Sequence, residues 1–285
     1  MQWALILATV GLYAAACVAG LRSVSGRRWA AGVHYRLFVV LGFLTHTALG
    51  ILRWHALGQF PATQAAESVW LLVWFMVLAI VVMDYIYGLP TLAAFLMPVV
   101  LLLAVMGLFL GRPSSFQASS WTPVHVVAAV LGFCGFAVAA TSSLLYLLQE
   151  RALKSKAANG IPGRLPSLET LDRLNFHALV FGFALLTLGL GIGIERAVAT
   201  GQLGPAWWRD PKVILSELVW AFYGAVVVCR LVRSLRGRRI ARLTLAGFAL
   251  VLVVLAGADR LAPGMHAKLG ERAGTDRQES SEQAK

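Results

Sequence analysis

Charged residues are scarce in this sequence. They make up 13% of its 285 residues, while hydrophobic residues make up 59%. An ordinary soluble domain carries about twice that share of charge. The apolar residues form long blocks, and the short alternating segments of a membrane β-barrel are missing. The scarcity of charge therefore excludes a soluble globular domain, and the long blocks favour helices that cross a lipid bilayer.

Cysteine is also rare, and several common motifs are missing. Cys17, Cys134 and Cys229 lie inside apolar blocks without metal-binding spacing, so we interpret them as buried thiols. No phosphate-binding loop, H-E-x-x-H zinc motif or serine-nucleophile elbow is present. Basic residues outnumber acidic ones by 25 to 13, but they gather in short loops between apolar blocks. Membrane topology explains this excess, and the sequence predicts no nucleic-acid partner.

Eight apolar blocks predict eight transmembrane helices, because about 20 residues at 1.5 Å each span the roughly 30 Å hydrocarbon core. The expected fold class is an all-α, polytopic membrane helix bundle. We expect residues 1–269 to form a single transmembrane domain and residues 270–285 a disordered polar tail. No repeat with a period of about 20–50 residues is visible. The predicted helices are Trp3–Leu21, Leu37–Leu52, Val69–Tyr87, Thr91–Leu110, Val124–Gln149, Phe176–Val198, Pro211–Val232 and Leu243–Ala258.

The loops between the predicted helices differ in charge. Lysine and arginine concentrate in the loops after the first, third, fifth and seventh helices. The positive-inside rule places these loops in the cytoplasm. Both termini are then expected outside, together with the loops that contain Trp54, Trp121 and Trp207–Trp208.

A tryptophan-rich stretch, Gly204–Lys212, leads into the seventh predicted helix. Asp210 followed by Pro211 is typical of an N-cap and a first helical residue. Trp207 and Trp208 precede them, where an indole ring suits the membrane–water boundary. An aromatic belt with a capped helix explains these features by itself, and a ligand-binding loop is the alternative.

Three of the six histidines stand out by position. His125 opens the fifth predicted helix and His266 follows the eighth, both at the expected outer face. Neutral imidazole is a common axial ligand of haem iron, and indole rings suit a flat macrocycle. Spacing alone does not bring the two histidines together. His46 lies about ten residues into the second helix, where either a hydrogen bond to a neighbouring helix or a functional role explains a polar group.

Motifs spread from the second predicted helix to His266 resemble those of a known family. They are Arg53-Trp54 with Gly58-Gln59-Phe60-Pro61 and Glu67-Ser68, then His125, Leu168–Asp172, Gly182-Phe183 with Leu186–Gly189, Trp207 with Asp210-Pro211-Lys212, Trp220, Phe248 and Gly264-Met265-His266. Together they resemble the cytochrome c assembly proteins (CcsA-like), and among these the smaller HemX/YpjD-like branch.

This resemblance implies a multi-pass protein of the bacterial plasma membrane that presents haem b at the outer face for attachment to apocytochrome c. Other cytochrome c biogenesis proteins would be its partners, besides the lipid bilayer. The axial ligands of the iron would be His125 and His266. The remaining cofactor-binding residues would be Trp207, Trp208, Asp210 and Trp220, with Arg209 pairing with a haem propionate.

Three departures from the family pattern favour an alternative. Arg209 stands where the family has its second signature tryptophan, and Val213 stands where it has a glutamate. Cys229 replaces a histidine that ligates a second haem within the membrane. The alternative is a haem-free structural or regulatory membrane protein of the HemX-like kind. A small-molecule permease is a third reading, which the lack of a matched pair of interrupted helices disfavours.

Overall fold

The structure is a computed structural model that describes residues 2–24, 30–61, 65–86, 88–110, 121–155, 165–200, 207–209, 211–232 and 236–261. These residues contain no strand, and eight of their helices are long and apolar enough to cross a membrane. The predicted all-α membrane bundle is therefore confirmed. The elements are α1 (Gln2–Val24), α2 (Ala30–Leu57), α3 (Ala65–Val81), the π turn η1 (Val82–Ile86), α4 (Pro90–Phe109), α5 (Thr122–Lys154), α6 (Leu168–Thr200), the 3₁₀ turn η3 (Trp207–Arg209), α7 (Pro211–Val232) and α8 (Arg238–Leu261).

Several helices extend beyond the predicted apolar blocks. The largest extension is at the start of α6, which begins at Leu168 rather than at Phe176. Arg173 donates to Glu169 over 3.0 Å, one turn apart, in this polar first part of the helix. Such i,i+4 pairs stabilise a helix in water, so the apolar block marks the bilayer and not the helix end. The predicted start of α7 at Pro211 is confirmed.

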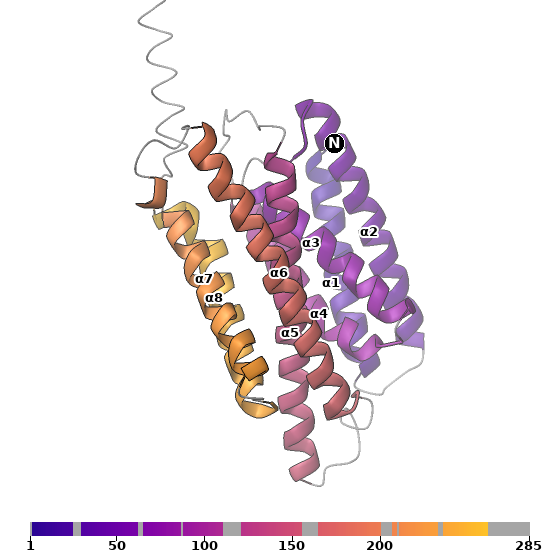
Figure 1. Cartoon of the computed structure of the whole chain (residues 1–285). Helices are drawn as coiled ribbons and strands as arrows, with labels where there is room; N and C mark the ends of the chain where they lie inside the picture. The colour runs from indigo at the N-terminus through magenta and orange to yellow at the C-terminus, as the bar shows by residue number, and fades with distance from the viewer. Residues whose placement is uncertain are drawn as a thin grey trace, which may run out of the picture.

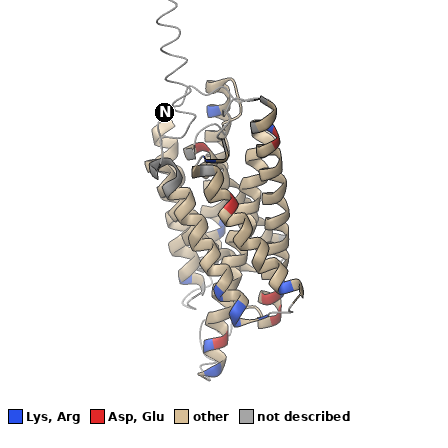
Figure 2. Cartoon of the chain, turned by 60° about the vertical axis from the view of Figure 1, so that its left-hand side comes forward, with Lys and Arg blue, Asp and Glu red and all other residues tan. Residues whose placement is uncertain are grey.

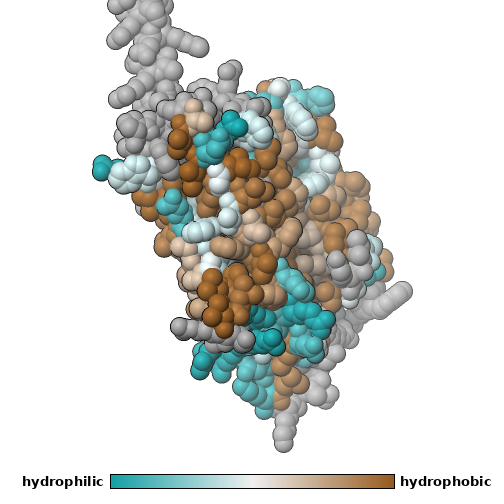
Figure 3. Space-filling model, viewed as in Figure 1, coloured by the Kyte–Doolittle hydropathy of each residue, from teal (hydrophilic) through white to brown (hydrophobic). Residues whose placement is uncertain are grey.

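The helices form one bundle (Figure 1), with α1 and α2 on one side and α7 and α8 on the other. In the middle lies α5, which packs against α3 and α4 as well as against α6 and α8. Charged residues gather at the two ends of the bundle, and few lie between them (Figure 2). We call the end at which α5 begins the His125 end, and the opposite end, where α5 and α7 finish, the basic end. Apolar side chains cover much of the surface between the two ends (Figure 3).

Glycines bring α5 and α6 into backbone contact. A Cβ atom on Gly135 would lie 2.9 Å from the Cα of Gly182, and one on Gly189 would lie 2.9 Å from the backbone nitrogen of Ala129. Small residues allow this close approach of the two backbones. Membrane helices depend on such packing because the hydrophobic effect does not drive their association within lipid. We call this contact the glycine seam. It fixes the position of α6 along α5.

The two halves of the chain have the same packing order. In the first half α1 contacts α2 and α4, and α3 contacts α2 and α4; in the second half α5 contacts α6 and α8, and α7 contacts α6 and α8. The contacts between α3 and α5, and between α4 and α5, join the halves. The bundle therefore consists of two four-helix units, α1–α4 and α5–α8.

Matched side chains support this equivalence. The indole of Trp74 in α3 donates to the hydroxyl of Thr47 in α2 over 2.9 Å. The indole of Trp220 in α7 donates to Thr187 in α6, also over 2.9 Å. In each unit a phenylalanine four residues before the threonine packs on the indole. The two threonines lie 140 residues apart and the two tryptophans 146, which sets the correspondence between the units.

Each unit also contains an arginine–aspartate ion pair between its second and third helices near the basic end, with the charges reversed. Arg36 of α2 donates twice to Asp84, in the π turn η1 that follows α3, over 3.0 Å. In the second unit the arginine comes from the later helix, because Arg230 of α7 donates to Asp172 of α6 over 2.7 and 2.8 Å. Asp84 and Arg230 are again 146 residues apart. Each four-helix unit thus has an ion pair between its second and third helices. The arginine comes from the second helix in the first unit and from the third helix in the second unit.

The buried ion pair of the second unit is expected to stabilise the bundle. The side chain of Arg230 is 7% exposed, so Arg230→Gln would leave Asp172 without its bidentate partner. We expect a loss of about 3 kcal/mol in the free energy of unfolding, measured by thermal or denaturant unfolding in detergent. Arg173→Gln is the matched control: its ion pair is exposed, and its loss should cost less than about 1 kcal/mol. Equal effects of the two substitutions would contradict the role of the Arg230 pair.

Candidate functional site

His125 lies in the first turn of α5, two residues after Pro123 and four after Trp121. Its Nδ1 atom lies 2.7 Å from the backbone carbonyl oxygen of Gly189 in α6. A carbonyl oxygen only accepts, so Nδ1 carries the hydrogen, and in the neutral ring Nε2 keeps its lone pair. Histidines that bind metals commonly donate their other ring nitrogen to a carbonyl in this way. The neighbouring helix therefore fixes the tautomer of His125 that can ligate iron.

A missing side chain on α6 makes room for the imidazole ring. A Cβ atom on Gly193 would lie 2.7 Å from Cε1 of His125 and 2.9 Å from Nδ1. Both distances are shorter than real Cβ contacts, so any side chain at this position would force the imidazole or the backbone to shift. Gly189 and Gly193 are four residues apart and so share one face of the helix. The sequence shows this spacing, but only the packing reveals that His125 occupies the gap.

An arginine and a tryptophan lie beside His125, and sequence reasoning assigned neither to the site. The guanidinium carbon of Arg196, near the end of α6, lies 4.6 Å from the ring centroid of Trp121. Its Nε atom lies 2.9 Å from a carboxylate oxygen of Glu195. The His125 end of α5 and α6 thus combines an imidazole, an indole and an arginine–glutamate pair.

The turn η3 contains the central part of the predicted tryptophan motif. Trp208 is 53% exposed, and the guanidinium carbon of Arg209 lies 4.6 Å from the centroid of its ring. In Figure 1 this turn precedes the start of α7, at the same end of the bundle as the start of α5. An exposed aromatic surface with a positive charge can bind a flat, anionic ligand.

Trp220 lies on the outer surface of the bundle, where it is 39% exposed, and away from this turn. It is nine residues after Pro211, or about 13 Å along α7 at 1.5 Å per residue. Its indole donates to Thr187 and packs on Phe183 with ring centroids 5.8 Å apart. The structure therefore shows Trp220 joining α6 to α7.

Not all of the predicted site lies in the described part of the chain. Residues 262–285 and Asp210 fall outside it, and so does the side chain of Trp207. The pairing of His125 with His266 and the capping role of Asp210 remain predictions. The predicted disordered tail, 270–285, is likewise outside the described residues.

A second polar cluster lies inside the first unit. His46 is 4% exposed and Tyr13 is fully buried, and His46 Nδ1 lies 2.9 Å from the hydroxyl oxygen of Tyr13 in α1. The ring of Trp70 meets the imidazole edge-on, with centroids 5.1 Å apart. The sequence left two explanations for His46, a hydrogen bond to a neighbouring helix or a functional role. The structure shows the hydrogen bond.

The cysteines match their predicted environment in part. Cys17 and Cys134 are buried, and Cys229 is half-buried. Within the described ranges, no group of three or more His, Cys, Asp or Glu side chains is arranged to hold a metal ion. Metal binding by protein side chains alone is therefore not indicated for the described part of the chain.

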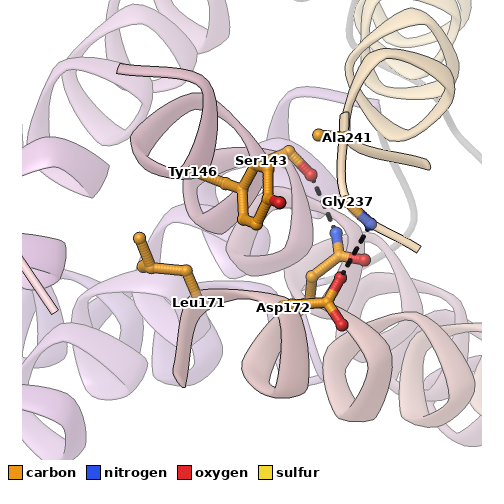
Figure 4. Close-up of a pocket in the computed structure, with 7 residues that line it drawn as sticks. Ser143, Tyr146, Leu171, Asp172, Gly237 and Ala241 are labelled. Atoms are coloured by element: carbon orange, nitrogen blue, oxygen red, sulfur yellow. Dashed lines mark hydrogen bonds between the residues drawn. The ribbon is translucent and has the colours of Figure 1, made fainter. Parts of the chain in front are cut away.

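A small cavity lies near the basic end of the second unit (Figure 4). Ser143 and Tyr146 of α5, Asp172 of α6 and Gly237 before α8 line it. The backbone N–H of Gly237 donates to Asp172 over 3.3 Å. The cavity offers about 10 Å³ to the centre of a water molecule, which is room for one water. It is too small for an organic ligand.

Comparison with known proteins points to one family. Residues 62–266 match a family model described as "Cytochrome C assembly protein". The range covers the helices from α3 to α8, together with His125 and the turn η3.

Individual relatives match over most of their length. The chain is 28% identical to a "Cytochrome c biogenesis protein CcsA" of Prochlorococcus marinus (strain MIT 9301), over 81% of this chain and 83% of that protein. It is 27% identical to a protein of the same name from Guillardia theta, over 80% of this chain and 82% of the relative.

A solved structure shares the fold. The chain superimposes on a "Cytochrome c Heme Lyase CcmF" with a TM-score of 0.59 and 15% identity, over 95% of this chain. It spans about half, 51%, of that longer protein.

The gap at Gly193 gives a direct test of the His125 geometry. Gly193→Ala would press a methyl group into the imidazole, and we expect it to lower the free energy of unfolding by about 1–3 kcal/mol. Gly191→Ala is the matched control, because nothing lies within 4 Å of its Cβ position; alanine there should be neutral or stabilise by up to about 1 kcal/mol. Thermal unfolding in detergent measures both, and a Gly193→Ala protein as stable as the control would show that His125 does not fill this gap.

Proposed function

Because this chain belongs to the cytochrome c assembly protein family, we propose that it binds haem at the His125 end of its membrane bundle and presents it for cytochrome c assembly. One observation carries the proposal. The hydrogen bond from His125 Nδ1 to Gly189 leaves Nε2 as the ligating atom, and haem iron accepts neutral imidazole in its axial positions.

The residues present fit such a ligand. Haem has two axial positions, and His125 and His266 are the proposed pair of ligands. The indoles of Trp207 and Trp208 would hold the macrocycle, and the exposed Arg209 would pair with a propionate. Asp210 would cap the start of α7. Trp220 would hold α7 against α6 through its hydrogen bond to Thr187, and so keep the Trp207–Trp208 turn in place. Haem b supplies the iron and the reactive vinyl groups; the protein's part is to bind and orient them.

The placement in the membrane follows from charge. Arginines at the basic end include Arg22, Arg151, Arg173 and Arg238. By the positive-inside rule this end faces the cytoplasm. Both termini and the His125 end then face outward, and the proposed location is the bacterial plasma membrane. Other cytochrome c biogenesis proteins are proposed as its partners, because the relatives that the chain matches are named for that process.

A haem-free structural or regulatory role is the second candidate. Two observations favour it: Arg209 replaces the second signature tryptophan, and Cys229 replaces the histidine expected within the membrane. The half-buried thiol lies beside Arg230, which forms the ion pair with Asp172. This neighbourhood serves the packing of α6 and α7 without any ligand.

An absorption spectrum separates the two candidates. The detergent-purified protein is expected to show a low-spin haem spectrum, and a pyridine haemochrome assay identifies the haem as type b. His125→Ala and His266→Ala should each abolish the low-spin spectrum, because each removes one axial ligand. His177→Ala, an exposed histidine of α6 far from the His125 end, is the matched control and should retain it. A protein without haem even after reconstitution would leave the structural or regulatory role as the better account.

Arg209 gives a second prediction. Guanidinium binds a carboxylate in a bidentate manner, and loss of one charge-assisted pair weakens binding by about tenfold or more. Arg209→Gln should therefore raise the dissociation constant for haem by about tenfold while the low-spin spectrum keeps its shape. A haem titration in detergent measures this change. An unaltered affinity would remove Arg209 from the site.

A further inference from the structure

Three arginines gather on one face at the start of α8, at the basic end of the bundle. Arg238, Arg239 and Arg242 lie within the first two turns of this helix, and all three are exposed. At about 100° per residue, they fall within an arc of about 100° around the helix axis. We call these three residues the arginine cluster.

The charge of the arginine cluster is only partly balanced within the bundle. Glu150 of α5 lies 3.9 Å from Nε of Arg238 and also interacts electrostatically with Arg242. The same carboxylate pairs with Lys154 over 2.7 Å. The first turn of α8 contains no acidic residue, and the helix dipole adds positive charge there. Like charges three and four residues apart repel each other, so the described residues leave the cluster with an excess of positive charge.

Arg239 and Arg242 are not needed to pack α8 into the bundle. The side chains at the start of α8 that pack inward include Ile240 and Thr244, which are buried. In the first unit the fourth helix is α4, which also begins at the basic end, and its sequence, Pro90–Phe109, has no charged residue. The positive-inside rule accounts for arginines at this end, but it does not account for their position on one exposed face.

The same face of α8 becomes apolar toward the middle of the bilayer. Ala246, Ala249 and Val253 are exposed, and at 100° per residue they fall within the arc of the arginine cluster. From Arg239 to Arg242 the helix advances about 4.5 Å, which fits within a headgroup layer about 5–7 Å thick. The exposed face of α8 is therefore cationic at the level of the lipid headgroups and apolar at the level of the acyl chains.

We propose that the arginine cluster binds the headgroup of an anionic phospholipid in the leaflet at the basic end, with the acyl chains along Ala246, Ala249 and Val253. Guanidinium groups bind phosphate with two parallel hydrogen bonds, and arginines at the membrane surface attract anionic lipids. The lipid supplies the negative charge that balances the cluster. This site lies at the opposite end of the bundle from His125, and it does not depend on haem.

The experiment compares two lipids that differ in headgroup charge. The full-length protein in detergent is titrated with phosphatidylglycerol, which is anionic, and with phosphatidylcholine of the same acyl chains, which has no net charge. Native mass spectrometry gives the dissociation constant of the first lipid bound. The wild-type protein should bind phosphatidylglycerol about tenfold more tightly. The double variant Arg239→Gln/Arg242→Gln should lose this preference, while it retains Arg238 beside Glu150.

Arg151→Gln/Arg173→Gln is the matched control. It removes the same two positive charges at the same end of the bundle, from exposed positions on α5 and α6, and it should keep the full preference. If the double variant of α8 does not accumulate in the membrane, the single substitutions Arg239→Gln and Arg242→Gln take its place. Each should lower the preference for phosphatidylglycerol by about threefold.

Several results would overturn this inference. If the folded α8 variants retain the wild-type preference, or if the control loses it to the same extent, the arginine cluster is not the lipid site. Equal binding of the two lipids by the wild-type protein would also contradict it. Glycerol 3-phosphate, which has the phosphate but no acyl chain, is added as a competitor at the concentration of the lipid and should not displace it. Displacement would show that the cluster binds a free phosphate rather than a lipid.

Discussion

The backbone contact between α5 and α6 is the constraint on which the candidate site depends. Gly135 and Gly182 let the two helices meet without intervening side chains, which sets the height of α6 against α5. Two turns from this contact, the carbonyl of Gly189 comes within 2.7 Å of His125. A larger residue in the seam would separate the helices and break that hydrogen bond. The tautomer of a surface histidine thus depends on packing deep in the bilayer.

The two four-helix units show which features the fold needs and which are additional. Both units join their second and third helices by a threonine–tryptophan hydrogen bond and by one arginine–aspartate pair. The reversal of charge between the units indicates that the pair matters more than its direction. By contrast, His125 with Gly193 occurs in the second unit alone, and His46 with Tyr13 in the first. These unmatched polar groups are where the two units have acquired separate roles.

The bilayer accounts for where the polar groups lie. An unpaired charge in hydrocarbon costs several kcal/mol, so Asp84 and Arg230, both buried, are each held by a partner. The hydroxyl of Thr47 and the imidazole of His46 are likewise hydrogen-bonded to groups of other helices. Polar contacts between helices replace, in this protein, the hydrophobic driving force that water gives to a soluble bundle.

The sequence by itself determined the number of membrane helices, the all-α class, the start of α7 at Pro211 and the family, because apolar length, proline chemistry and motifs are local properties of the chain. It predicted His125 as a site residue but gave no reason to connect it with Gly189, Gly193 or Arg196, more than 60 residues away. Only the tertiary structure decided those contacts and the equivalence of the two units. The physical reason is that a glycine leaves space on its helix, and only the packing of another helix decides which side chain fills that space.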